Sequence, residues 1–209
     1  MRSCSVFLLL VTSLILLATP ALAERPAVVV HAGVSSATYH QDDLSCDARE
    51  GFAAGLGAQV KLGGGFALMP EVWFLQKGFK DGTIWDLVDI EQRLDTVSIP
   101  VLLSYWFPAK RLDPRVFAGF SADFVTKSRI RKEGNEWQDV SAQDESFYWS
   151  LILGGGFRAK WFDLDVRYQH GLSQVTNFDY PQFDNVIPQD REQDPAYDRS
   201  WIFSVGVWF

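Results

Sequence analysis

The stretch SWIFSVGVWF, residues 200–209, alternates large apolar side chains with small or polar ones. In an extended strand, one face would carry Trp201, Phe203, Val205, Val207 and Phe209. Alternation with a period of two predicts a β-strand whose two faces meet different surroundings. Residues 162–169 repeat the pattern with charged residues on the polar face. A strand buried on both faces would read as a continuous apolar run, so this segment has one polar side.

Eight segments along the chain show this alternation. They cover residues 27–37, 52–62, 66–77, 95–107, 115–127, 146–157, 161–173 and 200–209. Most are long enough to cross a membrane as a tilted strand, which takes about 9–11 residues. Short spacers near 63–65, 108–114 and 158–160 alternate with long ones near 39–51, 78–94, 128–145 and 174–199. We therefore predict an all-β fold, an eight-stranded antiparallel up-and-down transmembrane β-barrel with short periplasmic turns and long extracellular loops. Pro70 and Pro100 each predict a bulge or an irregular pairing.

An export signal precedes these strands. Arg2 is followed by an apolar run from Phe7 to Ala18 and by the small-residue site Ala21-Leu22-Ala23. A membrane-spanning helix takes about 20 residues, so the run is short for one. Residues 1–23 are therefore expected to be a cleaved signal peptide and residues 24–209 the barrel domain. Cleavage would remove Cys4 and leave Cys46 without a partner for an internal disulfide.

The direction of the alternation separates a membrane barrel from a soluble one. A soluble lipocalin-like ligand-binding barrel, one alternative, has its apolar face inside and a charged outer face. Here the non-apolar face is mostly Gly, Ser and Ala, which is too sparse in charge for a solvated surface. Aromatic residues also gather near both strand ends, like the two interfacial girdles of a membrane barrel. Those near the short spacers are Phe66, Trp106, Phe107, Phe157, Trp161, Phe162 and Phe209, and those near the long spacers are Tyr39, Phe74, Phe79, Phe124, Trp149 and Trp201.

Charge follows the same asymmetry. Residues 174–199 carry six acidic and two basic residues, whereas residues 107–115 carry three basic and one acidic residue. This distribution predicts a protein of the cell outer membrane with long loops outside and both termini in the periplasm. Loss of Arg2 leaves 18 basic and 26 acidic residues, a net charge of −8, with no basic stripe. We therefore expect no nucleic-acid partner, and expect outer-membrane lipid and lipopolysaccharide as surroundings.

Three stretches carry a resemblance to a known family: LMPEVWFLQKGFK at 68–80, VSIPVLLSY at 97–105 and VRYQHGL at 166–172. The chain resembles the PorT family of small outer-membrane barrels, a type of outer membrane protein beta-barrel domain typical of Bacteroidetes and relatives. The resemblance implies the barrel fold and a structural, interaction or secretion-accessory role, with envelope or secretion proteins as partners. The strand that ends on Phe209 resembles the C-terminal signal of outer-membrane proteins, which implies the barrel-assembly machinery as a partner during biogenesis.

Charged residues on the inward face are the candidate site. Side chains fill the interior of an eight-stranded barrel, so we expect no porin-like channel. By alternation the inward charges are Lys61, Glu71, Lys77, Asp123, Asp163, Asp165 and Arg167. Charges away from water need partners, so we expect lumenal ion pairs. Glu71 and Arg167 form the best candidate pair because both fall mid-strand. A polar path for protons or small ions is the alternative role for these residues.

A barrel-borne lipid-modifying enzyme, a lipid A hydrolase or acyltransferase, is the main alternative function. His170 and Ser173 lie near the external end of the seventh predicted strand, with Asp165 and Asp179 close in sequence. A nucleophile needs a base within hydrogen-bond reach, yet alternation places His170 and Ser173 on opposite faces. We therefore expect a non-enzymatic protein with no catalytic residue.

No cofactor or metal is expected either. The carboxylates of residues 174–199 suit divalent cations, but their spacing matches no calcium loop, and a solvated external loop is the simpler interpretation. The glycine runs at 63–65 and 154–156 fall at a turn and in a strand, whereas a phosphate-binding glycine motif opens a helix.

Overall fold

A computed structural model of the chain describes residues 27–40, 45–84, 88–109, 112–132, 136–141, 146–173 and 197–209. The strands are β1 (Ala27–His40), β2 (Ser45–Gly63), β3 (Phe66–Ile84), β4 (Val88–Trp106), β5 (Asp113–Lys132), β6 (Gln138–Asp139), β7 (Phe147–Ala159), β8 (Phe162–Gly171) and β9 (Tyr197–Trp208). The predicted signal peptide, residues 1–23, lies outside the described residues. Within them, no helix combines the length and the apolar character needed to cross a membrane.

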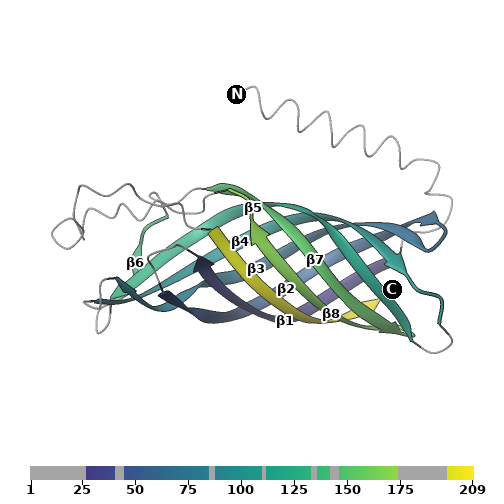
Figure 1. Cartoon of the computed structure of the whole chain (residues 1–209), viewed down its shortest axis with the longest axis horizontal. Helices are drawn as coiled ribbons and strands as arrows, with labels where there is room; N and C mark the ends of the chain where they lie inside the picture. The colour runs from purple at the N-terminus through teal and green to yellow at the C-terminus, as the bar shows by residue number, and fades with distance from the viewer. Residues whose placement is uncertain are drawn as a thin grey trace, which may run out of the picture.

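Eight of these strands close into an antiparallel barrel (Figure 1). The sheet order is β4-β3-β2-β1-β9-β8-β7-β5, and β4 also pairs with β5, so the sheet meets itself. The first and last strands pair from Val29 with Trp208 to His40 with Tyr197. β6 is a two-residue addition that pairs with the end of β5. The predicted eight-stranded up-and-down barrel is confirmed, and the C-terminus lies at the end of the barrel that carries the β2–β3 turn (Figure 1).

The central strands are longer than their apolar pattern predicts. β2 to β5 continue through residues 45–51, 78–84, 88–94 and 128–132, which the sequence assigned to loops. The apolar alternation ends earlier because outward positions that the structure describes in these extensions carry polar side chains, such as Arg49, Glu91 and Arg93. The backbone ladder nevertheless continues, for example from Lys77 paired with Leu94 to Ile84 paired with Val88. Two of the four long spacers are therefore largely strand, with only residues 41–44 and 85–87 between the strand ends.

The register shifts between strands do not coincide with the prolines. Pro70 and Pro100 were expected to mark a bulge or an irregular pairing. β3 and β4 keep one register on both sides of them, but the pairing is interrupted there, since residues 71 and 72 have no direct ladder partner on β4 and residues 69 and 70 have none on β2. Shifts occur instead at Ala48/Ala53, Phe79/Gly82 and Asp95/Thr96. The β2–β3 turn is the place where glycine is required, since Gly63, Gly64 and Gly65 have φ angles of 95°, 61° and 86°.

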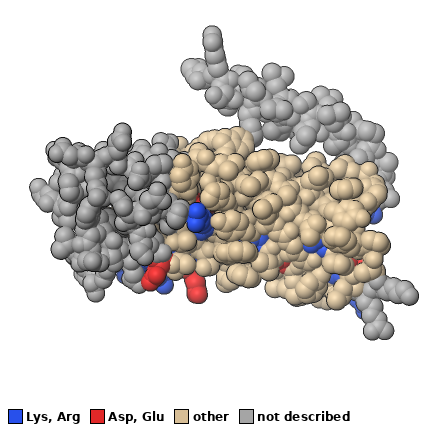
Figure 2. All heavy atoms as spheres, viewed as in Figure 1, with Lys and Arg blue, Asp and Glu red and all other residues tan. Residues whose placement is uncertain are grey.

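The outer face of the barrel is apolar over most of its length. In β9, Trp201, Phe203 and Val205 are exposed while Ile202 and Ser204 between them are buried. In the face seen in Figure 2, charged atoms form only small patches on this band. Exposed apolar residues on the other strands include Val30, Val34, Phe52, Leu56, Val72, Ile99, Leu103, Val116, Phe120, Leu153 and Val166. So large a continuous apolar surface needs an apolar environment around it.

Aromatic side chains border this band at both ends. Phe124, Phe147 and Trp149 are in ring contact toward the end that carries β6, with centroids 5.1 and 5.2 Å apart. Phe66, Tyr105 and Phe107 are in contact toward the other end, at 4.9 Å for both pairs. The girdle prediction is wrong for two residues. Phe79 is buried in the lumen, and Trp106 packs against the buried cluster that contains Trp208. Both fall on the inward face because of their strand register. The side chain of Tyr39 lies outside the described residues.

The strand extensions can be tested by hydrogen exchange. We expect the amides of residues 79–84 and 88–94 to exchange slowly in the folded protein, since ladder hydrogen bonds must open before exchange occurs. Mass spectrometry of peptides from the detergent-solubilised barrel would measure this. Peptides from the transmembrane parts of β3 and β4 serve as the protected reference, and exchange within seconds over residues 79–94 would contradict the extensions.

Candidate functional site

The lumen of the barrel holds a network centred on two arginines. Arg115 on β5 places Nη2 at 2.6 Å from Asp163 Oδ2 and 2.5 Å from Asp165 Oδ2, both on β8. Arg167 on β8 donates to Glu71 Oε2 on β3 at 2.7 Å and to Asp165 Oδ2 at 3.2 Å. All five side chains are at most 3% exposed. We call this group, Glu71, Arg115, Asp163, Asp165 and Arg167, the arginine network.

Aromatic rings pack around the arginine network. The indole Nε1 of Trp73 donates to Glu71 Oε2 at 2.7 Å, and the guanidinium of Arg167 lies 4.3 Å from the centroid of the Trp73 ring. The ring of His31 stacks on the same indole at 5.2 Å. Glu71 therefore receives one charged and one neutral hydrogen bond, which offsets much of the cost of burying its charge.

A second ion pair lies nearer the end of the barrel that carries β6. Lys77 Nζ donates to Asp198 Oδ2 at 2.6 Å and to the Tyr148 hydroxyl at 3.2 Å. These residues come from β3, β9 and β7, and none of them is more than 1% exposed. The ion pair and the Tyr148 hydroxyl therefore connect three strands across the lumen.

Asp123 is stabilised without a basic partner at hydrogen-bond distance. Its Oδ2 accepts hydrogen bonds from Ser121 Oγ at 3.0 Å, Ser150 Oγ at 2.5 Å and Gln169 Nε2 at 2.7 Å. Gln169 also donates to Ser121 Oγ at 3.2 Å. The donors to Oδ2 are all neutral, so among the described residues Asp123 belongs to a hydrogen-bond cluster and not to an ion pair.

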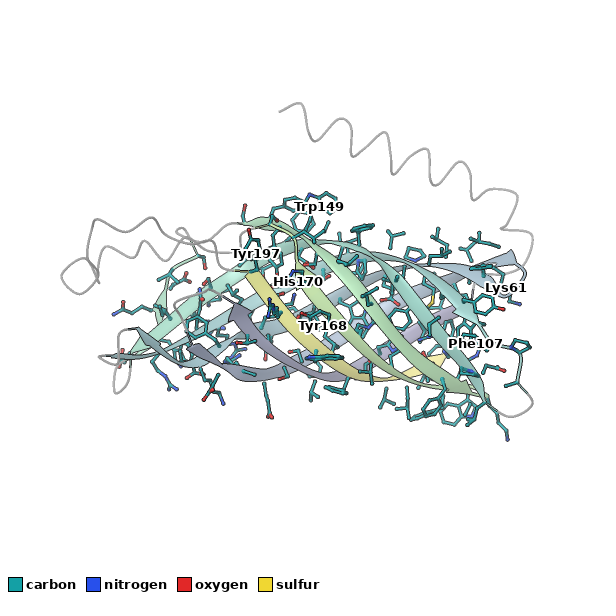
Figure 3. All side chains as sticks on the ribbon, in the orientation of Figure 1. Lys61, Phe107, Trp149, Tyr168, His170 and Tyr197 are labelled. Atoms are coloured by element: carbon teal, nitrogen blue, oxygen red, sulfur yellow. The ribbon has the colours of Figure 1, made fainter. Side chains whose placement is uncertain are left out.

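The structure places six of the seven candidate lumenal charges inside the barrel. Lys61 is the exception, because its side chain is exposed. It pairs with the buried Ala67 and so keeps the inward phase, but it lies next to the β2–β3 turn, where the lumen ends (Figure 3). Alternation predicts the face of a residue, and it does not predict how far along the barrel the enclosure extends.

Three lumenal partners were missing from the sequence prediction: His31, Arg115 and Asp198. Arg115 was counted with the charges of a short turn, and Asp198 with the acidic spacer before the last strand. Both continue the inward phase of their strands, Arg115 with Phe117 and Asp198 with Ser200. Extending the predicted strand 200–209 by two residues would have found Asp198, whereas Arg115 already began the predicted strand 115–127 and needed only to be assigned to its inward face.

Apolar side chains fill the rest of the lumen. One buried cluster contains Val29, Met69, Leu102, Phe117, Ile152 and Trp208, and a second contains Ala53, Trp73, Leu75 and Ile202. Gly55 makes room for the second cluster, since a Cβ on it would lie 2.4 Å from the Trp73 ring. The lumenal hydrogen bonds of the described residues include separate groups around Arg167, Lys77 and Asp123, and a contact between Gln92 and Ser128. The polar path for protons or small ions stays a prediction.

One group of described residues brings three possible metal ligands together. Ligand atoms of His31, Asp163 and Asp165 lie within 4.8 Å of one another. Both carboxylates, however, already bind the guanidinium of Arg115 through their Oδ2 atoms. A metal cation there would meet this fixed positive charge at close range, so the geometry fits an ion-pair network better than a metal centre.

The hydrolytic candidates are not arranged as a nucleophile and its base. The His170 ring stacks on Tyr168 with centroids 6.3 Å apart, and Tyr168 contacts Trp201 on the outer face. The Ser173 hydroxyl accepts the backbone N–H of Trp149 at 3.0 Å. Asp165 belongs to the arginine network, and Asp179 lies outside the described residues, as do the carboxylates of residues 174–196. Tyr168 and His170, labelled in Figure 3, are two residues apart on β8 and so lie on the same face of the strand.

Ion pairs also cross the outer face of the strand extensions. Asp95 on β4 receives Arg93 Nε at 3.2 Å and Arg129 Nη2 at 3.0 Å. Glu91 on β4 receives Arg49 Nε at 3.2 Å and Arg131 Nη2 at 2.5 Å. We call these two arrangements the Asp95 triad and the Glu91 triad. Each holds one carboxylate between two guanidinium groups, so each carries a net charge of +1.

β6 supports the end of this ribbon. Val140 N donates to Ser128 O at 3.0 Å, and Ser128 N donates to Ser141 Oγ at 2.9 Å, which ties the segment to β5. The Asp139 carboxylate accepts the Ser141 backbone N–H at 3.0 Å and its hydroxyl at 2.7 Å, and these two hydrogen bonds lower the pKa of Asp139. The Arg131 guanidinium packs 4.7 Å from the Trp137 ring centroid.

The Glu71–Arg167 pair can be tested by a double-mutant cycle. We expect Arg167→Met to lower the free energy of unfolding by about 3–5 kcal/mol, because it leaves Glu71 and Asp165 buried with fewer partners. Glu71→Gln added to Arg167→Met should cost less than the sum of the single changes. Urea unfolding in lipid vesicles measures all three variants. Lys61→Met, at an exposed site, is the control and should change stability by about 0.5 kcal/mol or less. Additive effects would show that the pair does not interact.

A comparison with protein families agrees with this architecture. Residues 23–177 match the family model described as outer membrane protein beta-barrel domain. The solved structures similar to this chain include Ail, the attachment invasion locus protein of Yersinia pestis, with 12% identity, a TM-score of 0.49, and coverage of 89% of this chain and 100% of that chain. They also include Neisserial surface protein A, with 14% identity, a TM-score of 0.48, and coverage of 88% and 99%. OprG from Pseudomonas aeruginosa has 10% identity, a TM-score of 0.49, and coverage of 88% and 96%.

No curated protein sequence matches the chain. The narrower resemblance to the PorT family stays a prediction. The matched family accounts for the closed sheet, the apolar outer face and the two aromatic borders, all of which a barrel in the outer membrane requires. Because the family model covers well over half of the 209 residues, the chain belongs to the outer membrane protein beta-barrel domain family.

Proposed function

We propose that this outer-membrane protein is a non-enzymatic barrel with a structural or interaction role and a filled lumen. The observation that carries the proposal is the filling of the lumen by the arginine network, the Lys77–Asp198 pair and two apolar clusters. An eight-stranded barrel is just wide enough for such side chains. A protein that conducts solutes would need to move many of them at once.

The strand extensions supply the surface for interaction. β2 to β5 continue past the aromatic border as a paired ribbon, which is more ordered than a free loop because its backbone groups are already bonded. A preformed surface loses little conformational freedom when it binds. Envelope or secretion proteins and lipopolysaccharide are the partners that we propose for it.

We further propose that both termini face the periplasm. The strands that end near Ala27 and Trp208 lie at the end that carries the two-residue β2–β3 and β7–β8 turns. The opposite end carries the strand extensions and the longer connections, which outer-membrane barrels direct outward.

Two alternatives have weaker support. A soluble ligand-binding barrel would bury its apolar face, whereas this barrel exposes it and fills its lumen with charged residues. A lipid-modifying enzyme would need a nucleophile next to a base, whereas His170 stacks on Tyr168 and Ser173 binds the Trp149 amide.

The C-terminal residue fits the proposed role as an assembly signal. The backbone of Phe209 pairs with Val28 in both directions, at 3.2 and 2.8 Å, while its side chain is 78% exposed. The ring therefore contributes little to packing in the finished barrel. We propose that the barrel-assembly machinery recognises it before the barrel closes.

Conductance tests the filled lumen. In planar lipid bilayers, the folded protein is expected to give no stable channels, because the lumen is packed with bonded side chains. A porin prepared in the same way is the positive control. Reproducible single-channel openings would contradict the proposal.

In cells that produce the protein, the mass of lipid A is expected to stay unchanged. A mass change that His170→Ala abolishes would favour the lipid-modifying enzyme.

The role of Phe209 can be separated from folding. We expect Phe209→Ala to change the unfolding free energy of the refolded barrel by about 0.5 kcal/mol or less, but to reduce the amount of folded protein in the outer membrane of cells. Heat-dependent migration on gels measures the folded fraction. Phe107→Ala removes another exposed ring at the same end and is expected to assemble normally. Equal assembly of both variants would rule out a signal role for Phe209.

A further inference from the structure

We infer that the Asp95 and Glu91 triads, with Lys127, form a binding site for the phosphate groups of outer-leaflet lipid. The inference goes beyond the proposed interaction role by naming a ligand class and the residues that bind it. It rests on the proposed orientation, in which the strand extensions face outward.

The accessible charge of the two triads is positive. The Asp95 side chain is 13% exposed, whereas Arg93 and Arg129 on either side of it are each 28% exposed. Glu91 is 16% exposed, compared with 44% for Arg131 and 11% for Arg49. Three of the four guanidinium groups are thus more exposed than the carboxylate that each contacts. An approaching ligand meets these three cations first.

Lys127 adds a third positive charge to the same face. It pairs with Asp95 across the β4–β5 ladder and is exposed, as is Arg131 four residues later. Ser128 and Ile130 between these basic residues are buried, so Lys127, Arg129 and Arg131 share the outer side of β5. With the net +1 of each triad and the −1 of Asp139, which pairs with Arg129 across the β5–β6 ladder, these residues carry a net charge of +2.

The guanidinium groups keep donors available for a ligand. Each arginine has five N–H donors, while the contacts to Asp95 and Glu91 use one nitrogen of each. The Arg131 guanidinium rests on the Trp137 ring, which limits its motion. Arginines held in this way bind phosphate in a planar, two-point geometry at a low entropic cost.

The position of the site favours a lipid phosphate over a soluble anion as its ligand. Phe124 pairs with Val97, and both belong to the outer aromatic and apolar border. Asp95 and Lys127 are only two and three residues beyond that pair, so the Asp95 triad lies directly above the ring of Phe124. Aromatic girdles mark the headgroup level of the membrane. The first polar groups that this site meets are therefore headgroups, and the phosphates of lipid A carry the complementary charge.

The test measures binding of lipid A to the full-length folded protein. Native mass spectrometry in detergent would follow titrations with diphosphoryl lipid A and with the same lipid after enzymatic removal of its phosphates. The test variant combines Arg93→Gln, Asp95→Asn and Arg129→Gln, which removes the triad without leaving a lone carboxylate. We expect it to bind diphosphoryl lipid A about tenfold more weakly than the wild type, as loss of charge-assisted hydrogen bonds implies. Binding of the dephosphorylated lipid should not distinguish the two proteins.

The controls match charge and folding. Lys61→Gln changes the net charge by the same −1 at the other end of the barrel and is expected to bind like the wild type. Arg129→Lys keeps the charge and should retain most of the binding. Only protein with the gel migration of a folded barrel is compared. Equal binding by the triad variant and the wild type would overturn the inference. So would binding of inorganic phosphate as tight as that of diphosphoryl lipid A, because the lipid would then contribute nothing.

Orientation is measured separately. In a Cys46→Ser background, the Asp139→Cys variant should react with a membrane-impermeant maleimide on intact cells, and the Lys61→Cys variant should not. The opposite result would overturn the proposed orientation, and with it the inference. If orientation holds and the triad variant binds normally, only the phosphate site is wrong.

Discussion

Closure between β1 and β9 is the constraint on which the rest of this structure depends. In hydrocarbon no water can satisfy an open sheet edge, so the ladder must return to its first strand. With eight strands that return fixes a narrow interior, which cannot stay empty or hold much water. Every inward side chain must therefore fit against others from distant strands, and every inward charge must find its partner within the same small volume.

The lumenal pairs show how this constraint is met. Glu71 on β3 and Arg167 on β8 are separated in the sheet by β2, β1 and β9, yet they meet across the interior. Lys77 on β3 reaches Asp198 on β9, and Arg115 on β5 reaches two carboxylates on β8. Because burying charge is costly, such pairs need not raise the net free energy of unfolding. They penalise any register in which one partner is lost, and so they help to specify a single alignment of the barrel.

Much of this could be predicted from the sequence because a strand has only two faces. Period-two alternation was enough to give the strand count, the lumenal placement of six charges, and the expectation that Glu71 and Arg167 would be partners. It could not place Lys61, whose face is inward but whose position lies beyond the enclosed part of the lumen. It also missed Arg115, which began the predicted strand 115–127 but was counted with the charges of the short turn. It missed Asp198 because the last strand was started where its apolar alternation starts and not where backbone pairing starts. The polar extensions of β2 to β5 were missed for the same reason.

The outer basic face depends on a feature that strict alternation would have placed wrongly. On β5 the inward residues up to the register shift are odd-numbered, including Arg115, Phe117, Ser121 and Asp123. Continued without interruption, this phase would turn Lys127, Arg129 and Arg131 into the lumen. Asp95 pairs with Lys127 but Thr96 pairs with Val125, so Thr126 is an extra residue in β5, and its hydroxyl donates to Asp95 O at 2.7 Å.

Such a bulge reverses the faces of everything that follows it. Ser128 and Ile130 become buried, and the three basic residues turn outward at the level where the apolar band ends. One inserted residue thus lets the same strand present apolar side chains to lipid along one part of its length and positive charge to headgroups along the next.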